Sequence, residues 1–278
     1  MQKKSILKIK KTGKVYKFDK DNYLISYRKK SNIQKKWLRP LQEIVNKYND
    51  FFVDGSLHSI YVRGSVASGM AFDNLSDIDL VVLFKNKYCK VSKYDAMHFF
   101  SSVEKDIKND YPFVAKIDGK KGNYYKDIPV DIVFKIKHQS ICIYGENIQG
   151  ELPKFKKDAI PSHVYNLYSC HNDIIDINNV LLNSTPDSIQ IKAMMRWASK
   201  VIVRSGFQLV FNRINVWSRD LYQCYKLFSD VYPEKQEKMK LALIKAILPT
   251  DNKNDMIEIY NEIGDWIIKE TRRVNGKM

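Results

Sequence analysis

One short apolar run constrains the chain more than any other segment: Asp77-Ile78-Asp79-Leu80-Val81-Val82-Leu83-Phe84. Its length and composition predict a buried β-strand. Side chains two residues apart on a strand share a face, so Asp77 and Asp79 point the same way while Ile78 packs behind them. Two adjacent carboxylates repel each other unless a cation lies between them. Because Mg²⁺ prefers a few carboxylates, water and phosphate oxygens, the run indicates a magnesium–nucleotide site.

A Gly64-Ser65 pair precedes this strand and follows another strand candidate at residues 58–63. Glycine lets the backbone approach a phosphate closely. Amides at the start of the short helix expected next, together with the Ser65 hydroxyl, are suitable phosphate donors. Three neighbouring residues are candidates either for nucleotide contact or for local structural roles: Arg63, Ser68 and Ser76.

A third isolated acid, Asp131, interrupts an apolar run that begins at Pro129. We expect a strand over residues 129–137, which an adjacent position in the sheet would bring beside Asp77 and Asp79. Three carboxylates would complete a two-metal site, with ions about 3.5–4 Å apart. Asp131 is then expected to ligate metal and to help remove a proton from an acceptor hydroxyl.

The order of these motifs resembles the signature of the DNA-polymerase-β-like nucleotidyltransferases: Gly64-Ser65, Asp77-x-Asp79, then Asp131. The stretch RGSVASGMAFDNLSDIDLVVLF is similar to the version in bacterial antibiotic nucleotidyltransferases, of the aminoglycoside and lincosamide type, and in related stand-alone enzymes. The resemblance implies a mixed-sheet core, two Mg²⁺ ions, an NTP donor and release of pyrophosphate. It assigns phosphate contact to Gly64 and Ser65 and metal ligation to the three aspartates.

The expected secondary structure changes after Pro153, from mixed strands and helices to helices alone. We therefore expect an α+β protein with a polymerase-β-like mixed-sheet catalytic domain over residues 1–150 and a helical, substrate-binding bundle over residues 151–278. Proline-containing breaks delimit the expected helices, which are residues 159–182, 187–211, 217–230, 234–247 and 253–271.

Basic residues recur every four positions on the second of these helices: Lys192, Arg196, Lys200 and Arg204. Such spacing places them on one face of the helix. The face is either simply solvated or directed at phosphates. Lys200 is the favoured triphosphate ligand, by analogy with related folds that use a helical lysine there.

Positive charge is concentrated at the N-terminus. Residues 1–40 contain fourteen Lys or Arg against Asp19 and Asp21, a net +12 of the chain's +16. This asymmetry favours an anionic partner such as nucleic acid, although lysine-rich codon usage also accounts for it. No run approaches the roughly 20 apolar residues that span a bilayer, so we expect a cytoplasmic protein without membrane contact.

Three functions are consistent with these patterns. The leading hypothesis is Mg²⁺-dependent transfer of an NMP, expected to be AMP from ATP, to a hydroxyl on a small molecule. The second keeps this chemistry but places the acceptor on tRNA or protein, as in toxin-type enzymes, and is motivated by the basic N-terminus. The third is a catalytically silent regulator that binds nucleotide, which the presence of all three carboxylates disfavours.

Overall fold

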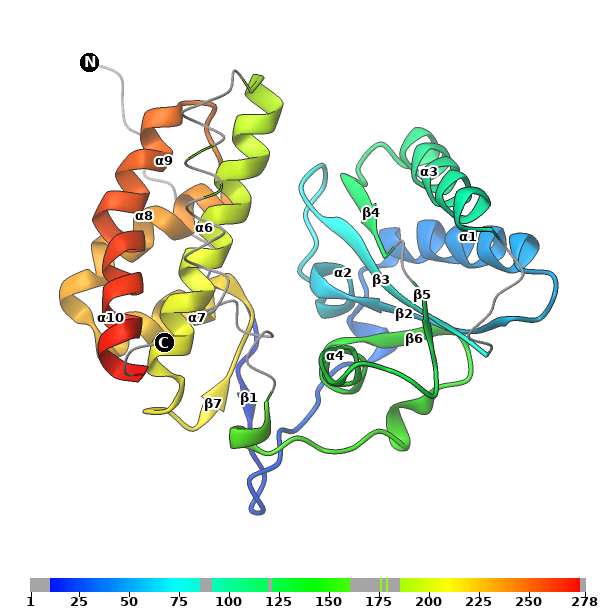
Figure 1. Cartoon of the computed structure of the whole chain (residues 1–278), viewed down its shortest axis with the longest axis horizontal. Coiled ribbons are helices and arrows are strands. Elements are labelled where there is room, and N and C mark those ends of the chain that lie inside the picture. The colour runs from blue at the N-terminus through cyan, green and yellow to red at the C-terminus, as the bar shows by residue number, and fades with distance from the viewer. Residues whose placement is uncertain are drawn as a thin grey trace. The chain divides into compact units, whose positions relative to one another are not determined.

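The structure is a computed structural model that describes residues 11–85, 92–119, 122–160, 176, 179 and 186–275. Contacts divide the chain into two compact units, coloured along the chain in Figure 1. The α/β unit comprises residues 19–160, and the helical unit comprises residues 1–18 and 161–278. Among the described residues, no helix combines the length and the apolar character needed to cross a membrane.

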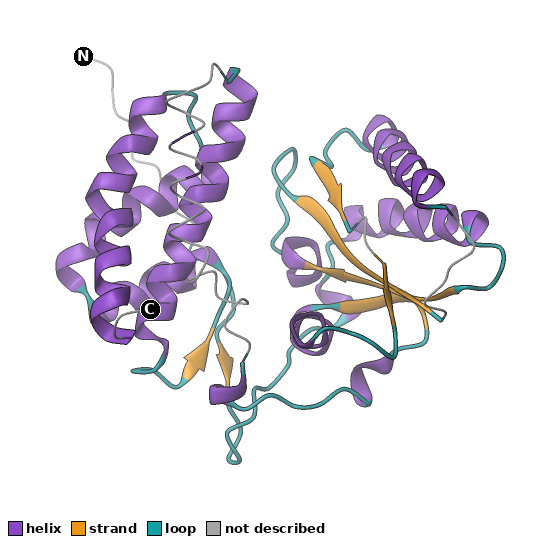
Figure 2. Ribbon diagram, in the orientation of Figure 1, coloured by secondary structure: helices purple, strands orange, loops and turns teal. Residues whose placement is uncertain are grey.

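A mixed sheet forms the centre of the α/β unit (Figure 2). Its described strands are β2 (Leu57–Arg63), β3 (Asp77–Phe84), β4 (Lys116–Asp118), β5 (Gly122–Tyr124) and β6 (Ile141–Gly145). The strand order is β4-β3-β2-β6, and β5 also pairs with β3. The strand β2 is antiparallel to β3 and β6, whereas β3 is parallel to β4 and β5. The expected mixed-sheet α+β class is therefore confirmed.

Helices cover both faces of this sheet. The described helices of the unit are α1 (Lys35–Phe51), α2 (Gly64–Ser68), α3 (Lys93–Asp110) and α4 (Val130–Gln139), with 3₁₀ turns at Lys30–Asn32, Ile148–Gly150 and Lys157–Ala159. Ile78, Leu80 and Val82 pack in the same core as buried residues of α1 and α3, whereas Val81 and Leu83 pack with Ile136 of α4. This alternation confirms that β3 is a strand buried on both faces.

The strand expected over residues 129–137 is wrong, because α4 is a helix. Its two ends show why helix is favoured. Near the start, the Lys135 ammonium lies 2.7 Å from the Asp131 carboxylate, one helical turn away. At the end, the side-chain amide of Gln149 donates to the carbonyl oxygens of Ile136 and Ser140, at 2.7 and 3.0 Å. A short apolar run fits either structure by itself, so these polar contacts were needed to distinguish them.

Five described α-helices dominate the helical unit: α6 (Ser188–Phe211), α7 (Leu221–Val231), α8 (Gln236–Ile247), α9 (Lys253–Ile259) and α10 (Asp265–Asn275). A π-helical turn, Tyr260–Gly264, joins the last two. These helices correspond to the last four expected helical stretches. The first expected helix, residues 159–182, lies almost wholly outside the described residues.

The N-terminal strand belongs to the helical unit. The strand β1 (Tyr16–Lys17) pairs antiparallel with β7 (Val216–Trp217), and the ring of Tyr16 meets that of Trp217 edge-on at 5.3 Å. Next to it, the Lys14 amide donates to the Asp220 carboxylate at 2.6 Å. Residues 1–18 therefore group with the helical unit, through a pairing that joins residues about 200 positions apart and leaves no local signal.

Candidate active site

The acidic pair lies at the start of β3. Asp77 and Asp79 alternate with the buried Ile78 and Leu80, so both carboxylates emerge on the side opposite those apolar residues. The pairing register places Arg63, the last residue of β2, beside Asp79. The same register brings the Gly64-Ser65 turn to the acidic end of β3. The sequence motif and the acidic strand are therefore neighbours in space.

The Gly64 turn packs directly against Asp79. Gly64 has a φ of +70°, and a Cβ added there would lie 2.1 Å from the Asp79 Oδ2 atom. Any larger residue would be strained by the left-handed backbone and would also displace the carboxylate. Glycine is thus required at this position whether or not a phosphate binds, because a residue without a side chain lets the turn lie directly against Asp79.

Asp118, which the sequence pattern did not single out, completes a row of charged residues across three strands. It lies opposite Asp79 in the parallel pairing of β3 with β4. The Arg63 guanidinium bridges the two acids, at 3.1 Å from the Asp79 carboxylate and 3.7 Å from that of Asp118. The only local signal was an acid just before a glycine, which is too common to indicate a site.

The three serines near the turn have different roles. Ser65 is half-buried in the first turn of α2, and its carbonyl accepts from the Ser68 hydroxyl at 3.0 Å. The Ser76 hydroxyl accepts from the Phe72 amide at 2.8 Å and is buried. Ser68 and Ser76 thus hydrogen-bond to the backbone on either side of the loop, and contact of either serine with a nucleotide stays a prediction.

Asp131 lies on a helix and not on a strand of the sheet that carries the acidic pair. It lies in the first turn of α4, and its carboxylate, 22 % exposed, is paired with Lys135. Within the described ranges, no group of three acidic, histidine or cysteine side chains is arranged to hold a metal ion. Asp131 is therefore carried by a helix and not by a neighbouring strand as expected, and its role as the third acid stays a prediction.

Lys200 belongs to the other unit. It lies on α6 and is half-buried. Elsewhere on the same basic stripe, Lys192 is 3.4 Å from the Asp251 carboxylate, and the Arg204 Nε donates to the Arg219 carbonyl at 3.4 Å. Parts of the stripe thus serve the packing of the helical unit itself. Contact between Lys200 and a triphosphate stays a prediction.

The acidic end of β3 is suited to a divalent cation. Asp77 and Asp79 supply two carboxylates from one strand face, and a positive group, the Arg63 guanidinium, already bridges Asp79 and Asp118. Mg²⁺ typically takes one or two protein carboxylates and completes its shell with water and phosphate oxygens. The donor set therefore fits Mg²⁺ bound together with a nucleotide.

Comparison with known families supports this arrangement. Residues 45–159 match the family model described as a nucleotidyltransferase domain, whereas comparison with curated proteins found no match. The matched stretch begins within α1 and contains the whole described sheet, including the Gly64 turn and the acidic row. The chain therefore contains a nucleotidyltransferase domain of the DNA-polymerase-β-like superfamily.

Proposed function

We propose that this protein transfers an NMP, AMP from ATP in the first instance, to a hydroxyl of a small molecule and releases pyrophosphate. The observation that carries the proposal is the contact of the Gly64 turn with Asp79. A turn that accepts phosphate next to a carboxylate that ligates metal is the arrangement that a metal–triphosphate complex requires.

Different residues would bind the metal ion and the phosphates. Asp77 and Asp79 would hold Mg²⁺, which when bound neutralises the charge that develops on the triphosphate during in-line attack. Gly64 and Ser65 bring backbone amides and a hydroxyl to the phosphates. Arg63 balances the negative charge of Asp79 and Asp118 and keeps both carboxylates extended toward the same point.

Two residues compete for the role of third acid. The order of motifs favours Asp131, whereas the register with Asp79 favours Asp118. Asp118→Asn and Asp131→Asn, assayed side by side for pyrophosphate release, separate these assignments. The third acid is the one whose substitution approaches the loss seen for Asp77→Asn. Similar small losses in both variants would show that two carboxylates are sufficient.

The direct test of the proposal is incubation of the protein with each labelled NTP, Mg²⁺ and a panel of acceptors. The panel includes hydroxyl-bearing aminoglycosides and lincosamides, total tRNA and protein. We expect label on a small molecule and an equal amount of pyrophosphate, both lost in Asp77→Asn. ATP binding with no turnover on any acceptor would instead indicate a silent regulator.

Whether the acceptor is a polynucleotide held by the basic N-terminus is better tested by substitutions than by deleting the N-terminal segment. Deleting residues 1–30 would remove Tyr16, which is buried against Trp217, and would damage the helical unit. Lys17→Glu/Lys20→Glu changes two exposed charges and leaves β1 in place. Salt-sensitive loss of tRNA labelling in this variant, with activity on small molecules retained, would favour the tRNA-modifying alternative.

A further inference from the structure

A second surface of the α/β unit has the features of a binding groove. An open groove of about 530 Å³ lies between α1 and β6. Its apolar floor includes Leu38 and Val45 of α1 and Ile143 of β6. Leu38 is 42 % exposed, whereas Leu41 and Val45 of the same helix are buried. None of these residues belongs to the acidic row at Asp79.

The rim of the groove is positively charged. Lys30, Lys35 and Arg39 line it, and no carboxylate is among its lining residues. Within the described part of the chain, none of the three cations forms an ion pair. Two other lysines of α1, which carries Lys35 and Arg39, do form pairs: Lys36 with Asp73, and Lys47 with Asp106 at 2.8 Å. On α1, the cations that line the groove are thus the ones without an ion pair among the described residues.

The groove also borders an edge strand, because Ile143 of β6 is part of its lining. The strand β6 stands at the end of the sheet order and, among the described strands, pairs only with β2. The outer edge of such a strand presents backbone donors and acceptors to an added strand. An extended peptide can therefore gain main-chain hydrogen bonds there, while alternate side chains reach the floor and the rim.

From this combination we infer that the groove binds an extended, acidic segment of a partner protein, with aliphatic side chains alternating with Asp or Glu. A single-stranded nucleic acid fits less well, because its bases need aromatic platforms and the groove lining contains no aromatic residue. A second copy of this chain also fits less well, because two molecules of net charge +16 repel.

The probe for this inference is a fluorescein-labelled peptide of about eight residues that alternates Glu and Val, long enough to add one strand. Anisotropy titrations at low salt would compare the full-length protein with Lys35→Glu/Arg39→Glu and with Leu38→Asp. We expect each variant to weaken binding by about tenfold or more, because contacts at the centre of the groove are lost or reversed. The matched control, Lys20→Glu/Lys105→Glu, makes the same change of net charge at exposed sites outside the groove.

Hydrogen exchange provides an independent readout. Addition of the peptide as a strand should slow exchange in residues 141–145 of the wild-type protein and not in Lys35→Glu/Arg39→Glu. The inference is overturned if the peptide fails to bind, if the control variant loses as much affinity as the groove variants, or if β6 gains no protection. Tighter binding of an oligothymidylate of equal charge through Lys35 and Arg39 would also overturn it, as would self-association that the groove substitutions abolish.

Discussion

The α/β unit and the helical unit use charged side chains in opposite ways. At the end of β3, Asp79 and Asp118 share one guanidinium and remain 23 % and 58 % exposed. In the helical unit, Glu270 is 8 % exposed and accepts from Tyr232 and, through both oxygens, from Arg273. Among the described residues, Arg63 is the partner of the first two carboxylates, whereas the lone pairs of Glu270 are largely used by the protein.

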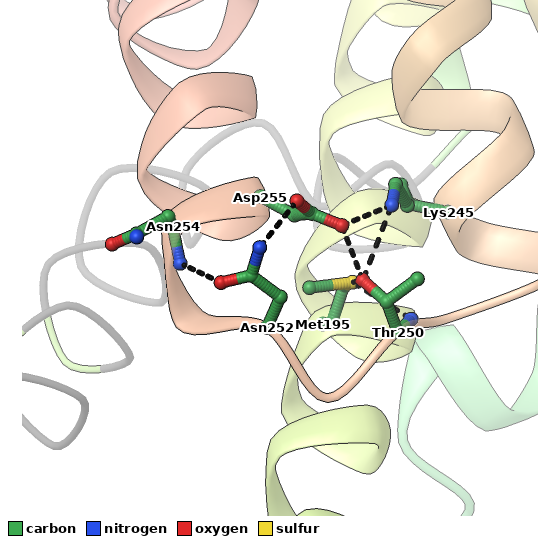
Figure 3. Close-up of polar contacts among 6 residues, drawn as sticks. All are labelled: Met195, Lys245, Thr250, Asn252, Asn254 and Asp255. Atoms are coloured by element: carbon green, nitrogen blue, oxygen red, sulfur yellow. Dashed lines mark hydrogen bonds and ion pairs between the residues drawn. The ribbon is translucent and has the colours of Figure 1, made fainter.

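In a second network of the helical unit, several donors from the protein likewise bind one carboxylate (Figure 3). The Asp255 carboxylate is held by Lys245, by the Thr250 hydroxyl and by Asn252, and the Thr250 amide donates to the Met195 sulfur at 3.3 Å. These contacts fasten the loop between α8 and α9 to α6. The contrast gives a rule to test on these residues: Glu270 and Asp255, whose acceptor positions are taken up by the protein, stabilise structure, whereas Asp79 and Asp118 are available to a ligand.

Asp79→Asn should give the largest effect and tests this rule most directly. Loss of a metal-ligating charge is expected to lower the rate of pyrophosphate release by roughly a thousandfold or more. The free energy of unfolding should change by less than about 1 kcal/mol, because the pair with Arg63 is partly exposed. Activity assays and urea unfolding on the same preparation check both parts. A variant that unfolds easily yet keeps its activity per folded molecule would contradict the rule.

Gly64→Ala should give the next largest effect, because the added methyl would displace the Asp79 carboxylate. We expect activity to fall by about a hundredfold, the usual cost of a 1 Å misplacement at a reacting centre. Gly55→Ala is the matched control: Gly55 has the same φ of +70°, but an added Cβ there meets nothing within 4 Å. Both variants should carry a similar backbone strain, of about 1–2 kcal/mol. Equal losses of activity would mean that strain alone, and not contact with Asp79, is responsible.

The parts of the fold that the sequence predicts are those with a local period. The apolar alternation in β3 fixes which face Asp77 and Asp79 share, and the three- and four-residue spacing of Trp37, Leu41 and Tyr48 identifies α1. For the site, the short segment between Gly64 and Asp79 carries enough local information to place a turn beside a strand.

The parts that escaped prediction depend on distant pairing or on polar contacts. Asp118 joins the site only through the parallel pairing of β3 with β4, which has three residues and a weak pattern of its own. Asp131 lies on a helix because contacts from Lys135 and Gln149 favour it, and apolar periodicity cannot show such contacts. Likewise, the pairing of β1 with β7 has no local signal.

His138 is a buried titratable side chain of the α/β unit, and its surroundings predict the pH range in which acid destabilises the protein. Burial, with a smaller contribution from Lys137, lowers the pKa of His138 from 6.5 to about 4. The unfolded chain therefore takes up this proton at a higher pH than the folded chain does. The free energy of unfolding should fall as the pH drops from 6.5 to 4, by about 3 kcal/mol in total. Urea unfolding across this range would measure the decline.

His138→Leu is the control for this window. It removes the titrating group from an apolar site, beside Phe134 and Phe155, where neither ring nitrogen has a hydrogen-bond partner among the described residues. The pH dependence between 6.5 and 4 should flatten in this variant. If the free energy of unfolding still falls as steeply with pH in this variant, groups other than His138 cause the acid sensitivity.

Glu270→Gln should give the smallest effect and tests the helical unit. The carboxylate's bond to the Arg273 guanidinium, and secondarily that to Tyr232, lowers the pKa of Glu270 to about 2. Its contribution to stability is therefore present above pH 4.5 and is lost only as the pH falls through about 2. Replacing the charge with an amide of similar size should cost about 2 kcal/mol at neutral pH, the usual value of a hydrogen bond to a charged group.

The activity of Glu270→Gln separates structure from catalysis. Pyrophosphate release per folded molecule should equal that of the wild-type protein, because the three hydrogen bonds described above for this carboxylate all come from its own unit. Arg273→Met, which removes the main partner and leaves Glu270 half-satisfied, should destabilise at least as much, since a buried charge is then uncompensated. If either variant lowers the rate per folded molecule while the unfolding midpoint is unchanged, Glu270 acts in the reaction, and a filled set of acceptors no longer identifies a structural carboxylate in this chain.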